Sequence, residues 1–207
     1  MTTYKDDVEM LKANLINVSK YWDGKSCVLE LKEADYNWRQ MEWWAFYFEY
    51  KVKNILVDKF TFPGDRYDNV TFDLKGSINW DLKAKAIKSD DHKVILNDKS
   101  AMEQSVEKSG YHGEIIALCD VEYNDVNWSF RKWQAELKGK WDFDFEKNKD
   151  FSLYKYCVTN LSLVGFLLLI FTKNDLQKLD VFEKSKIEKY MFDLEKSYLF
   201  ENYKIEV

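Results

Sequence analysis

The chain has 207 residues and a mass of 24.8 kDa, which suits a single domain with a sizeable core. A hydrophobic content of 46% and an aromatic content of 17% exclude an intrinsically disordered chain. The net charge of −5 argues against bulk electrostatic attraction to nucleic acid or to anionic lipid, so any positive charge that binds a nucleic acid has to be local.

The cysteines and the apolar runs bear on the compartment. Cys27, Cys119 and Cys157 are odd in number and widely spaced, so neither a disulfide framework nor a thiolate zinc site is predicted. The first ten residues are charged and lack an apolar stretch, so no signal peptide is expected. Residues 161–172 are about half as long as the ~20-residue helix that crosses a membrane, and they fit a buried strand better. We therefore expect a cytoplasmic protein with no membrane segment.

The first quarter of the chain is predicted to be mainly helical. Residues 4–21 form an amphipathic helix in which the apolar positions are Val8, Leu11, Leu15 and Val18. Residues 26–32 fit a short strand or a helical turn, and the sequence does not separate the two. Asp35 or Asn37 then caps a long helix within residues 38–56, whose apolar stripe consists of Met41, Trp44, Phe48, Val52 and Ile55. The tryptophans of this region, Trp38, Trp43 and Trp44, are expected to pack in the core rather than to stack on bases.

Strands are predicted after this helix. Residues 57–62 form a possible strand that ends at the turn Pro63-Gly64-Asp65. Residues 70–76 form a second strand, rich in β-branched and aromatic side chains. The third strand, residues 78–87, alternates: its apolar face carries Trp80, Leu82, Ala84 and Ala86, and its other face carries Asp81, Lys83 and Lys85. We expect this charged face to meet solvent.

The second half continues the alternation of helices and strands. A polar turn at 88–93 precedes a short helix at 97–108, which Gly110 ends, and a buried strand at 113–123. The remaining predicted elements are a helix at 125–138, a loop at 141–151, a strand at 161–172, a helix at 175–182 and strands at 189–194 and 203–207. This half is expected to extend the sheet.

The spacing of Asp81 and Lys83 suits phosphodiester chemistry. Two residues apart in a strand, their side chains project from one face about 6.5 Å apart. A tight hairpin would place Asp73 beside Asp81, and two such carboxylates hold Mg²⁺. The metal polarises a phosphate and lowers the pKa of a bound water, while the lysine reaches that water or the phosphate.

The stretch from Phe72 to Ala86 resembles the PD-(D/E)xK nuclease superfamily, which includes many type II restriction endonucleases. That superfamily has an αβββαβ core, with an Asp at the end of the second strand and an Asp/Glu-x-Lys on the third. The resemblance covers roughly residues 38–123 and departs from the pattern at Phe72, where a proline often stands. It identifies Asp73, Asp81 and Lys83 as catalytic, with Asp73 and Asp81 holding the metal.

The resemblance also implies a fold and a further site residue. Many members of the superfamily carry a Glu on the first core helix; Glu49 matches that position, and Glu42 is a second candidate. The expected class is α/β (α+β, with a mixed sheet): one domain over residues 1–207, with a restriction-endonuclease-like core at 38–123, an N-terminal helix and an extension at 124–207.

The resemblance predicts a metal-dependent endonuclease that cleaves double-stranded DNA with Mg²⁺, for which Mn²⁺ can substitute. Lys85 could bind a flanking phosphate, and Arg131 and Lys132 lie in the best candidate for a DNA-facing helix. Since one site cuts one strand, a homodimer is expected. The alternative is an inactive nuclease-like protein that binds a protein partner, as an inhibitor, an immunity protein or a subunit.

Three further residues are weaker candidates for the site. His112 could lie at the rim of the site, but an isolated histidine is more often a loop residue. Glu114 and Asp120 lie at the two ends of that strand and are weaker candidates for metal ligands.

Overall fold

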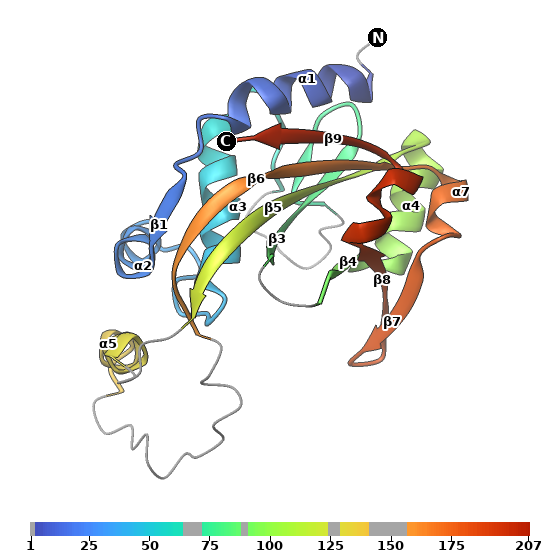
Figure 1. The fold of residues 1–207 in the computed structure, drawn as a ribbon. Coiled ribbons are helices and arrows are strands. Elements are labelled where there is room, and N and C mark those ends of the chain that lie inside the picture. Colours follow the sequence, from blue (N-terminus) through green and yellow to red (C-terminus); the bar gives the residue numbers. More distant parts are fainter. Residues whose placement is uncertain (1–2, 64–71, 88–90, 124–128, 141–156) are drawn as a thin grey trace.

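The computed structural model of the chain describes residues 3–63, 72–87, 91–123, 129–140 and 157–207 (Figure 1). The helices are α1 (Tyr4–Leu15), α2 (Gly24–Glu33), α3 (Trp43–Leu56), α4 (Lys99–Ser109), α5 (Ser129–Leu137), α7 (Lys173–Leu176) and the 3₁₀ helix η2 (Leu194–Leu199). The strands are β1 (Tyr21–Asp23), β2 (Leu74–Lys75), β3 (Asn79–Ala86), β4 (Lys93–Asp98), β5 (His112–Tyr123), β6 (Val158–Phe171), β7 (Asp180–Lys184), β8 (Ile187–Asp193) and β9 (Glu201–Glu206).

These elements form a mixed α/β fold, as predicted. The larger sheet has the strand order β1-β6-β5-β3-β2, with β9 also paired to β6, and the smaller sheet has the order β4-β8-β7. The long strands β5 and β6 cross the centre of the molecule as an antiparallel pair. The predicted strand at 161–172 is therefore confirmed as a central buried strand.

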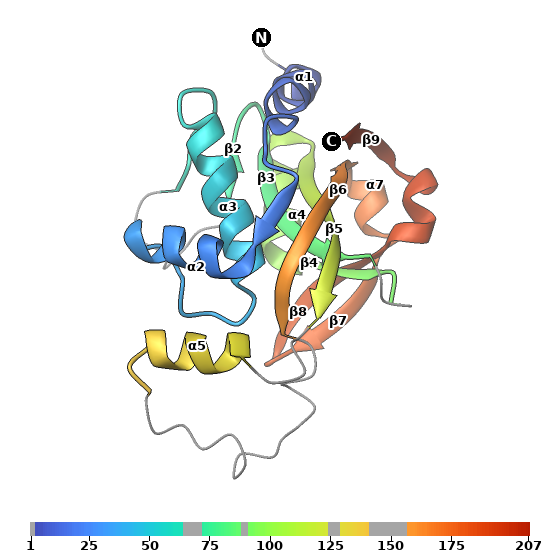
Figure 2. The same cartoon turned by 60° about the vertical axis from the view of Figure 1, so that its left-hand side comes forward.

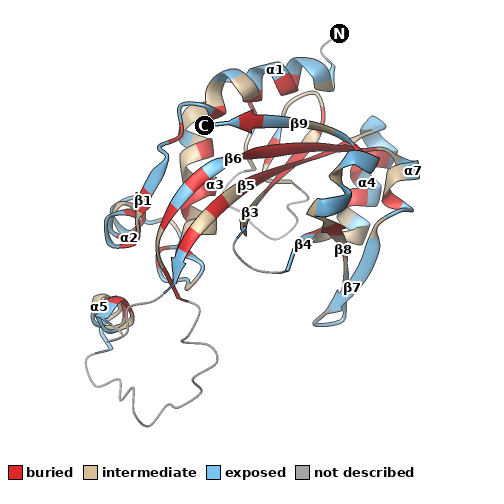
Figure 3. Cartoon of the chain, in the orientation of Figure 1, coloured by how far each residue is buried: buried red, intermediate tan, exposed pale blue. Residues whose placement is uncertain are grey.

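The larger sheet separates two hydrophobic cores. One core packs α1, α2 and α3 against one face of the sheet, and the other packs α4, α7, β4 and β8 against the opposite face. Figure 2 shows α2 and α3 to one side of β5 and β6, with α7, β7 and β8 to the other. Because side chains alternate along a strand, β5 serves both cores: Ile115 and Ala117 face the first and Ile116 the second. Buried residues follow β5 and β6 in Figure 3.

The predicted motif strand is confirmed as β3, and its neighbours fix its position. β2 and β3 form a tight antiparallel hairpin in which Leu74 pairs with Trp80. On its other side β3 runs parallel to β5, and Trp80 pairs with Gly113. The indole of Trp80 lies against Gly113 so closely that a Cβ there would be 2.3 Å from the ring. Position 113 therefore admits no side chain while Trp80 is in place.

A buried carboxylate on α1 holds the β2–β3 turn. Asp7, 7% exposed, accepts hydrogen bonds from the backbone N–H of Ser77 at 2.9 and 3.0 Å and of Ile78 at 3.3 Å. It also accepts one from Nε1 of Trp80 at 3.0 Å. A Cβ at Gly76 would lie 2.5 Å from Oδ1 of Asp7, so the turn requires glycine for this close approach. The N-terminal helix thereby fixes the turn from which β3 starts.

The long helix begins later than the sequence predicts. Asp35 and Asn37 do not cap α3; both have positive φ, 51° and 34°, in the turns that follow α2. The N-cap is Glu42, so the second candidate for the helix glutamate precedes the helix and is exposed. The buried stripe consists of Trp43, Tyr47, Phe48, Val52 and Leu56. Residues 26–32, left open by the sequence, belong to helix α2.

Three strand or helix predictions need correction. The strand at 57–62 is reduced to one bridge between Thr61 and Lys75, because the N–H groups of Lys59 and Phe60 still bond to the carbonyl of Leu56 at the end of α3. The helix at 175–182 spans only Lys173–Leu176, since residues from 180 onward pair with β8. Of the polar turn predicted at 88–93, residues 88–90 lie outside the described residues, and Lys93 begins β4, a strand that was not predicted.

Other predictions hold, or lie outside the described residues. The helix that Gly110 ends is α4, and Gly110 has the left-handed φ of 81° expected of such a cap. All three cysteines are buried, and none is in a disulfide. The predicted turn at 64–65, the first residues of the strand at 70–76, Trp128 and the loop at 141–151 lie outside the described ranges. In the part of the chain that the structure describes, no helix has the length and apolar character to cross a membrane.

Replacing Asp7 by Ala is expected to destabilise the protein by about 2–4 kcal/mol, because three buried or half-buried donors lose a charged acceptor. Glu9→Ala on the exposed face of the same helix removes an equal charge and one surface ion pair with Lys12, and is expected to cost less than about 1 kcal/mol. Urea unfolding monitored by tryptophan fluorescence measures both. Equal losses in the two variants would contradict the role given to Asp7.

Candidate metal centre on the motif strand

The alternation of β3 presents Asp81 and Lys83 on one face, as predicted. Trp80 and Leu82 are buried in the first core, so the charged residues project from the opposite side of the sheet. The expected solvent exposure is wrong for Asp81, which is only 2% exposed. Residues from α3 and β4 lie beside it in the pocket and withdraw it from water.

The hairpin brings Asp73 next to this strand. The backbone N–H of Asp73 donates to the carbonyl of Trp80 at 3.0 Å, and Oδ2 of Asp73 accepts from the backbone N–H of Leu82 at 2.7 Å. Asp73 and Asp81 line the same pocket and interact electrostatically. The geometry thus places the two predicted metal ligands together.

Glu49 of α3 completes this pocket. The cavity has a volume of about 290 Å³ and is lined by Tyr36, Glu49, Lys53, Phe62, Pro63, Phe72, Asp73, Asp81, Leu82, Lys83 and Asn97. The hydroxyl of Tyr36 donates to Oε2 of Glu49 at 3.3 Å and orients the carboxylate. All four residues predicted as catalytic therefore lie on one cavity.

Burial, and then repulsion between neighbours, shifts the pKa values of the carboxylates in this pocket. Burial, together with the charge of Asp73, raises the pKa of Glu49 to about 7. Burial and the charge of Asp81 raise the pKa of Asp73 to about 6. Asp81 behaves in the opposite way: burial alone would raise its pKa, but Lys83 and His112 hold the pKa below its ordinary value. Asp81 is therefore the carboxylate that stays ionised.

Lys83 is the cation around which these acids gather. Burial opposes its charge, but the carboxylates of Glu114, Asp81, Asp73 and Glu49 together raise its pKa above the ordinary value. Its ammonium donates to the carbonyl of Leu82 at 3.3 Å. Four carboxylates thus share one lysine, and the excess of negative charge favours the binding of a further cation.

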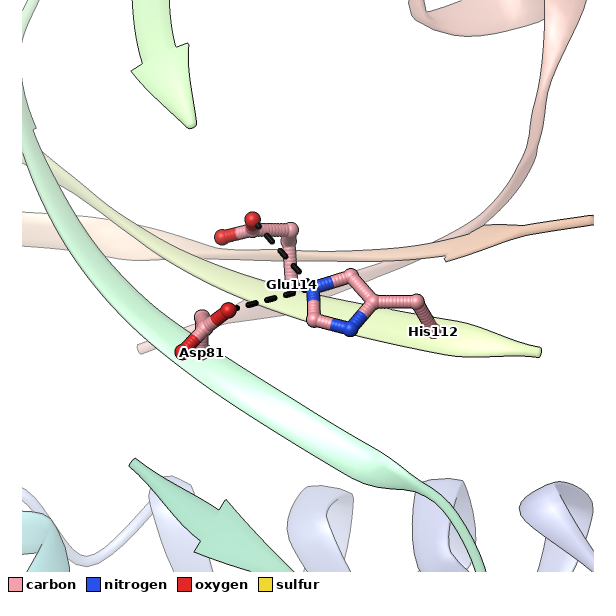
Figure 4. Close-up of side chains that lie close together, drawn as sticks. All are labelled: Asp81, His112 and Glu114. Atoms are coloured by element: carbon pink, nitrogen blue, oxygen red, sulfur yellow. Dashed lines mark ion pairs between the residues drawn. The ribbon is translucent and has the colours of Figure 1, made fainter. Parts of the chain in front are cut away.

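Behind Asp81, the parallel strand β5 contributes two more groups. Asp81 is the register partner of Glu114, and Nε2 of His112 lies 3.2 Å from Oδ2 of Asp81 and 3.5 Å from Oε1 of Glu114. Figure 4 shows the imidazole pointing between the two carboxylates. Both His112 and Glu114 are fully buried. The prediction that His112 belongs to a loop is wrong; it begins β5.

The buried triad of Asp81, His112 and Glu114 could hold a metal ion. Its potential ligand atoms all lie within 4.8 Å of one another. The contacts of His112 are ion pairs that do not meet the geometry of a hydrogen bond. Both ring nitrogens and both oxygens of Glu114 are therefore buried without a hydrogen-bond partner among the described residues. Burying such groups unsatisfied costs free energy, which a bound cation would recover.

Asn97 supports the same carboxylate from β4. Its Nδ2 donates to Oδ2 of Asp81 at 2.6 Å, the same oxygen that His112 approaches. Neither Asn97 nor Tyr36 was among the predicted site residues. No local signal marks either residue, because each acts through a neighbour from a separate element.

The residues expected to contact DNA lie outside the pocket. Lys85 shares the face of Lys83. Its ammonium donates to the carbonyl of Lys93 at 2.7 Å and to Oδ2 of Asp91 at 3.2 Å. A phosphate would have to compete with these two acceptors for Lys85. Arg131 and Lys132 are on α5, which packs against the start of α3 through Phe130. Asp120 also lies away from the triad, toward the other end of β5.

The chain was compared with protein-family models, with curated proteins and with solved structures, and none of the three comparisons found a match.

Replacing Glu49 by Gln is expected to stabilise the metal-free protein by about 1–3 kcal/mol at pH 8. The pKa of Glu49 is raised from 4.5 to about 7, so the folded state binds this proton more tightly than the unfolded state. The stability of the wild type therefore falls as pH rises from about 4.5 to 7, and Gln removes that loss. Urea unfolding with a chelator at pH 4.5 and pH 8 measures the difference.

The two proteins are expected to differ little at pH 4.5, where the penalty is small. Glu42→Gln supplies the control, since Glu42 is an exposed glutamate at the start of the same helix. If Glu49→Gln gained no stability over Glu42→Gln at pH 8, the proposed crowding of charge around Glu49 would be wrong.

Proposed function

We propose that this protein is a divalent-metal-dependent deoxyribonuclease of the PD-(D/E)xK type. One observation carries the proposal: Glu49, Asp73, Asp81 and Lys83, chosen from the sequence for their roles in that chemistry, line a single cavity of about 290 Å³. The first comes from a helix and the others from a hairpin, so their meeting does not follow from closeness in sequence alone. Their arrangement suits hydrolysis of a phosphodiester.

The order of elements supports the same proposal. From α3 through the β2–β3 hairpin to α4 and β5, the chain runs helix, strands, helix, strand, and β5 returns parallel to β3. Two features differ from the αβββαβ pattern. The first strand is a single bridge at Thr61. The additional strand β4 belongs to the smaller sheet, where it pairs with β8. The residues that carry the motif are on the elements that match.

The acids and the lysine have different roles in the proposed reaction. Asp73 and Asp81 would hold Mg²⁺, or Mn²⁺ in its place, since hard carboxylate oxygens suit both ions. A metal bound there supplies Lewis-acid polarisation of the phosphate and an acidified water. Lys83 orients the attacking water or neutralises charge on the phosphate. Glu49, with its raised pKa and its bond to Tyr36, is suited to exchange a proton with a water in the pocket.

The proposed substrate is double-stranded DNA inside the cell. Three buried cysteines, none of them in a disulfide, fit the reducing cytoplasm. The acidic chain attracts DNA weakly, so binding would depend on basic residues near the pocket, such as Lys53 on its wall, and on the metal itself. The sequence-based candidates Lys85, Arg131 and Lys132 would contribute only if the duplex extends beyond the pocket.

The purified protein is expected to nick or linearise plasmid DNA with Mg²⁺ or Mn²⁺ and not with a chelator. Asp81→Asn and Lys83→Ala are each expected to lower the rate more than tenfold, a change of more than about 1.4 kcal/mol in the barrier. Lys204→Ala, an exposed strand lysine on β9, is the matched control and should keep the wild-type rate. A gel assay with circular dichroism of each variant measures activity and folding together.

Activity that survives the chelator unchanged would exclude the proposal. So would wild-type rates in a folded Lys83→Ala variant. A folded wild type that is inactive with every divalent metal tested would favour the alternative, an inactive nuclease-like protein that binds a partner.

A homodimer is expected in solution, because one pocket hydrolyses one phosphodiester and a two-fold pair matches the symmetry of a duplex. The C-terminal strands offer exposed apolar side chains for the contact, among them Val181 and Phe182 on β7 and Ile187 on β8. Light scattering at micromolar concentration should give about twice the chain mass of 24.8 kDa. A monomer that linearises plasmid in one binding event would contradict the expected dimer.

A further inference from the structure

The triad behind Asp81 has the spacing of ligands around one ion. Two ligand atoms about 2.1 Å from a common metal lie about 3.0 Å apart at octahedral angles and about 3.4 Å apart at tetrahedral angles. Nε2 of His112 lies 3.2 Å and 3.5 Å from the oxygens of Asp81 and Glu114. The imidazole nitrogen therefore sits at ligand spacing from both carboxylates before any ion is considered.

A proton on the imidazole accounts for only part of these contacts. It would make His112 an ion-pair partner of both carboxylates, but a single N–H at Nε2 can point at one oxygen only. Neither contact meets the geometry of a hydrogen bond. Within the described ranges, both oxygens of Glu114 also lack a hydrogen-bond donor, although the side chain is fully buried. A buried carboxylate without hydrogen bonds is rare in proteins. A cation between Glu114, His112 and Asp81 would give a partner to Nε2 of His112 and to a carboxylate oxygen of Glu114 at once.

We propose that Asp81, His112 and Glu114 form a second cation site, separate from the pocket, which takes a transition-metal dication through one nitrogen and two carboxylate ligands. Neither His112 nor Glu114 lines the pocket, so this ion would lie on the β5 side of Asp81. Asp81 is the residue shared by the two sites. A role of the second ion in phosphodiester hydrolysis rests on the proposed function. The binding of the ion does not depend on that function.

The ligand set determines the class of ion. Mg²⁺ and Ca²⁺ are bound by oxygen ligands and keep several waters or many carbonyls, which a buried site with an imidazole does not suit. Mn²⁺, Fe²⁺ and Zn²⁺ accept imidazole together with carboxylate. The contact from Asn97 holds Oδ2 of Asp81 in place from outside, as partners of metal-ligand carboxylates do. Mn²⁺ is the practical probe because it is paramagnetic.

The test is pulsed electron paramagnetic resonance of Mn²⁺ bound to the full chain, made without a histidine tag. The chain has only two histidines, His92 and His112, so a nitrogen coupling from imidazole can be assigned. We expect the coupling in the wild type and in His92→Asn, whose half-exposed ring lies elsewhere, 3.6 Å from Glu195. We expect its loss in His112→Asn. Glu114→Gln, which keeps the shape of the side chain, should weaken Mn²⁺ binding at this site at least tenfold.

Mn²⁺ bound without an imidazole coupling, or a coupling that persists in His112→Asn, would overturn the second site. If His112→Asn does not fold, wild-type protein labelled with ¹⁵N-histidine keeps the test decisive, because the coupling must change to that of ¹⁵N. The two proposals fail separately. DNA cleavage without the nitrogen coupling overturns only the second site, whereas the coupling without cleavage overturns only the nuclease.

Discussion

The parallel pairing of β3 with β5 is the constraint on which the proposed site depends. The register sets Asp81 opposite Glu114, with His112 two residues before it on the same face. A shift of one residue would turn Glu114 and His112 into the first core and leave Asp81 without either group. Trp80 and Gly113 fix that register from the other face, since the indole fits only against a residue without a side chain. Packing in the first core therefore determines which side chains meet on the opposite face of the sheet.

Burial and repulsion of the charged groups in the site oppose folding. The stability of the surrounding structure compensates for this cost. Glu49 and Asp73 have raised pKa values, and four carboxylates gather around the single ammonium of Lys83. The surrounding structure supplies two hydrophobic cores and a central strand pair that is mostly buried. Functional sites often combine such local cost with stability provided elsewhere, and a bound cation would remove part of the cost.

Local patterns predicted the elements of this site, but not all of its members. Alternation in residues 79–86 gave the correct face to Asp81 and Lys83, and Gly110 marked the end of α4. His112 and Glu114 were undervalued because their importance comes from strand register, which no local pattern encodes. The strand expected at 57–62 has suitable residues, yet the end of α3 keeps bonding to its first N–H groups. Tertiary context overrode propensity there.

The hydrogen bonds from Asp7 to the β2–β3 turn have a consequence for how the protein can be divided. A segment limited to residues 38–123 contains every lining side chain of the proposed pocket except Tyr36. It still lacks the acceptor for three donors of its own hairpin. It also lacks β6, the partner of the whole length of β5. The pocket is therefore not a transplantable module. A chimaera that carries it into another scaffold would have to bring both α1 and β6, although they lie outside the segment that holds the motif.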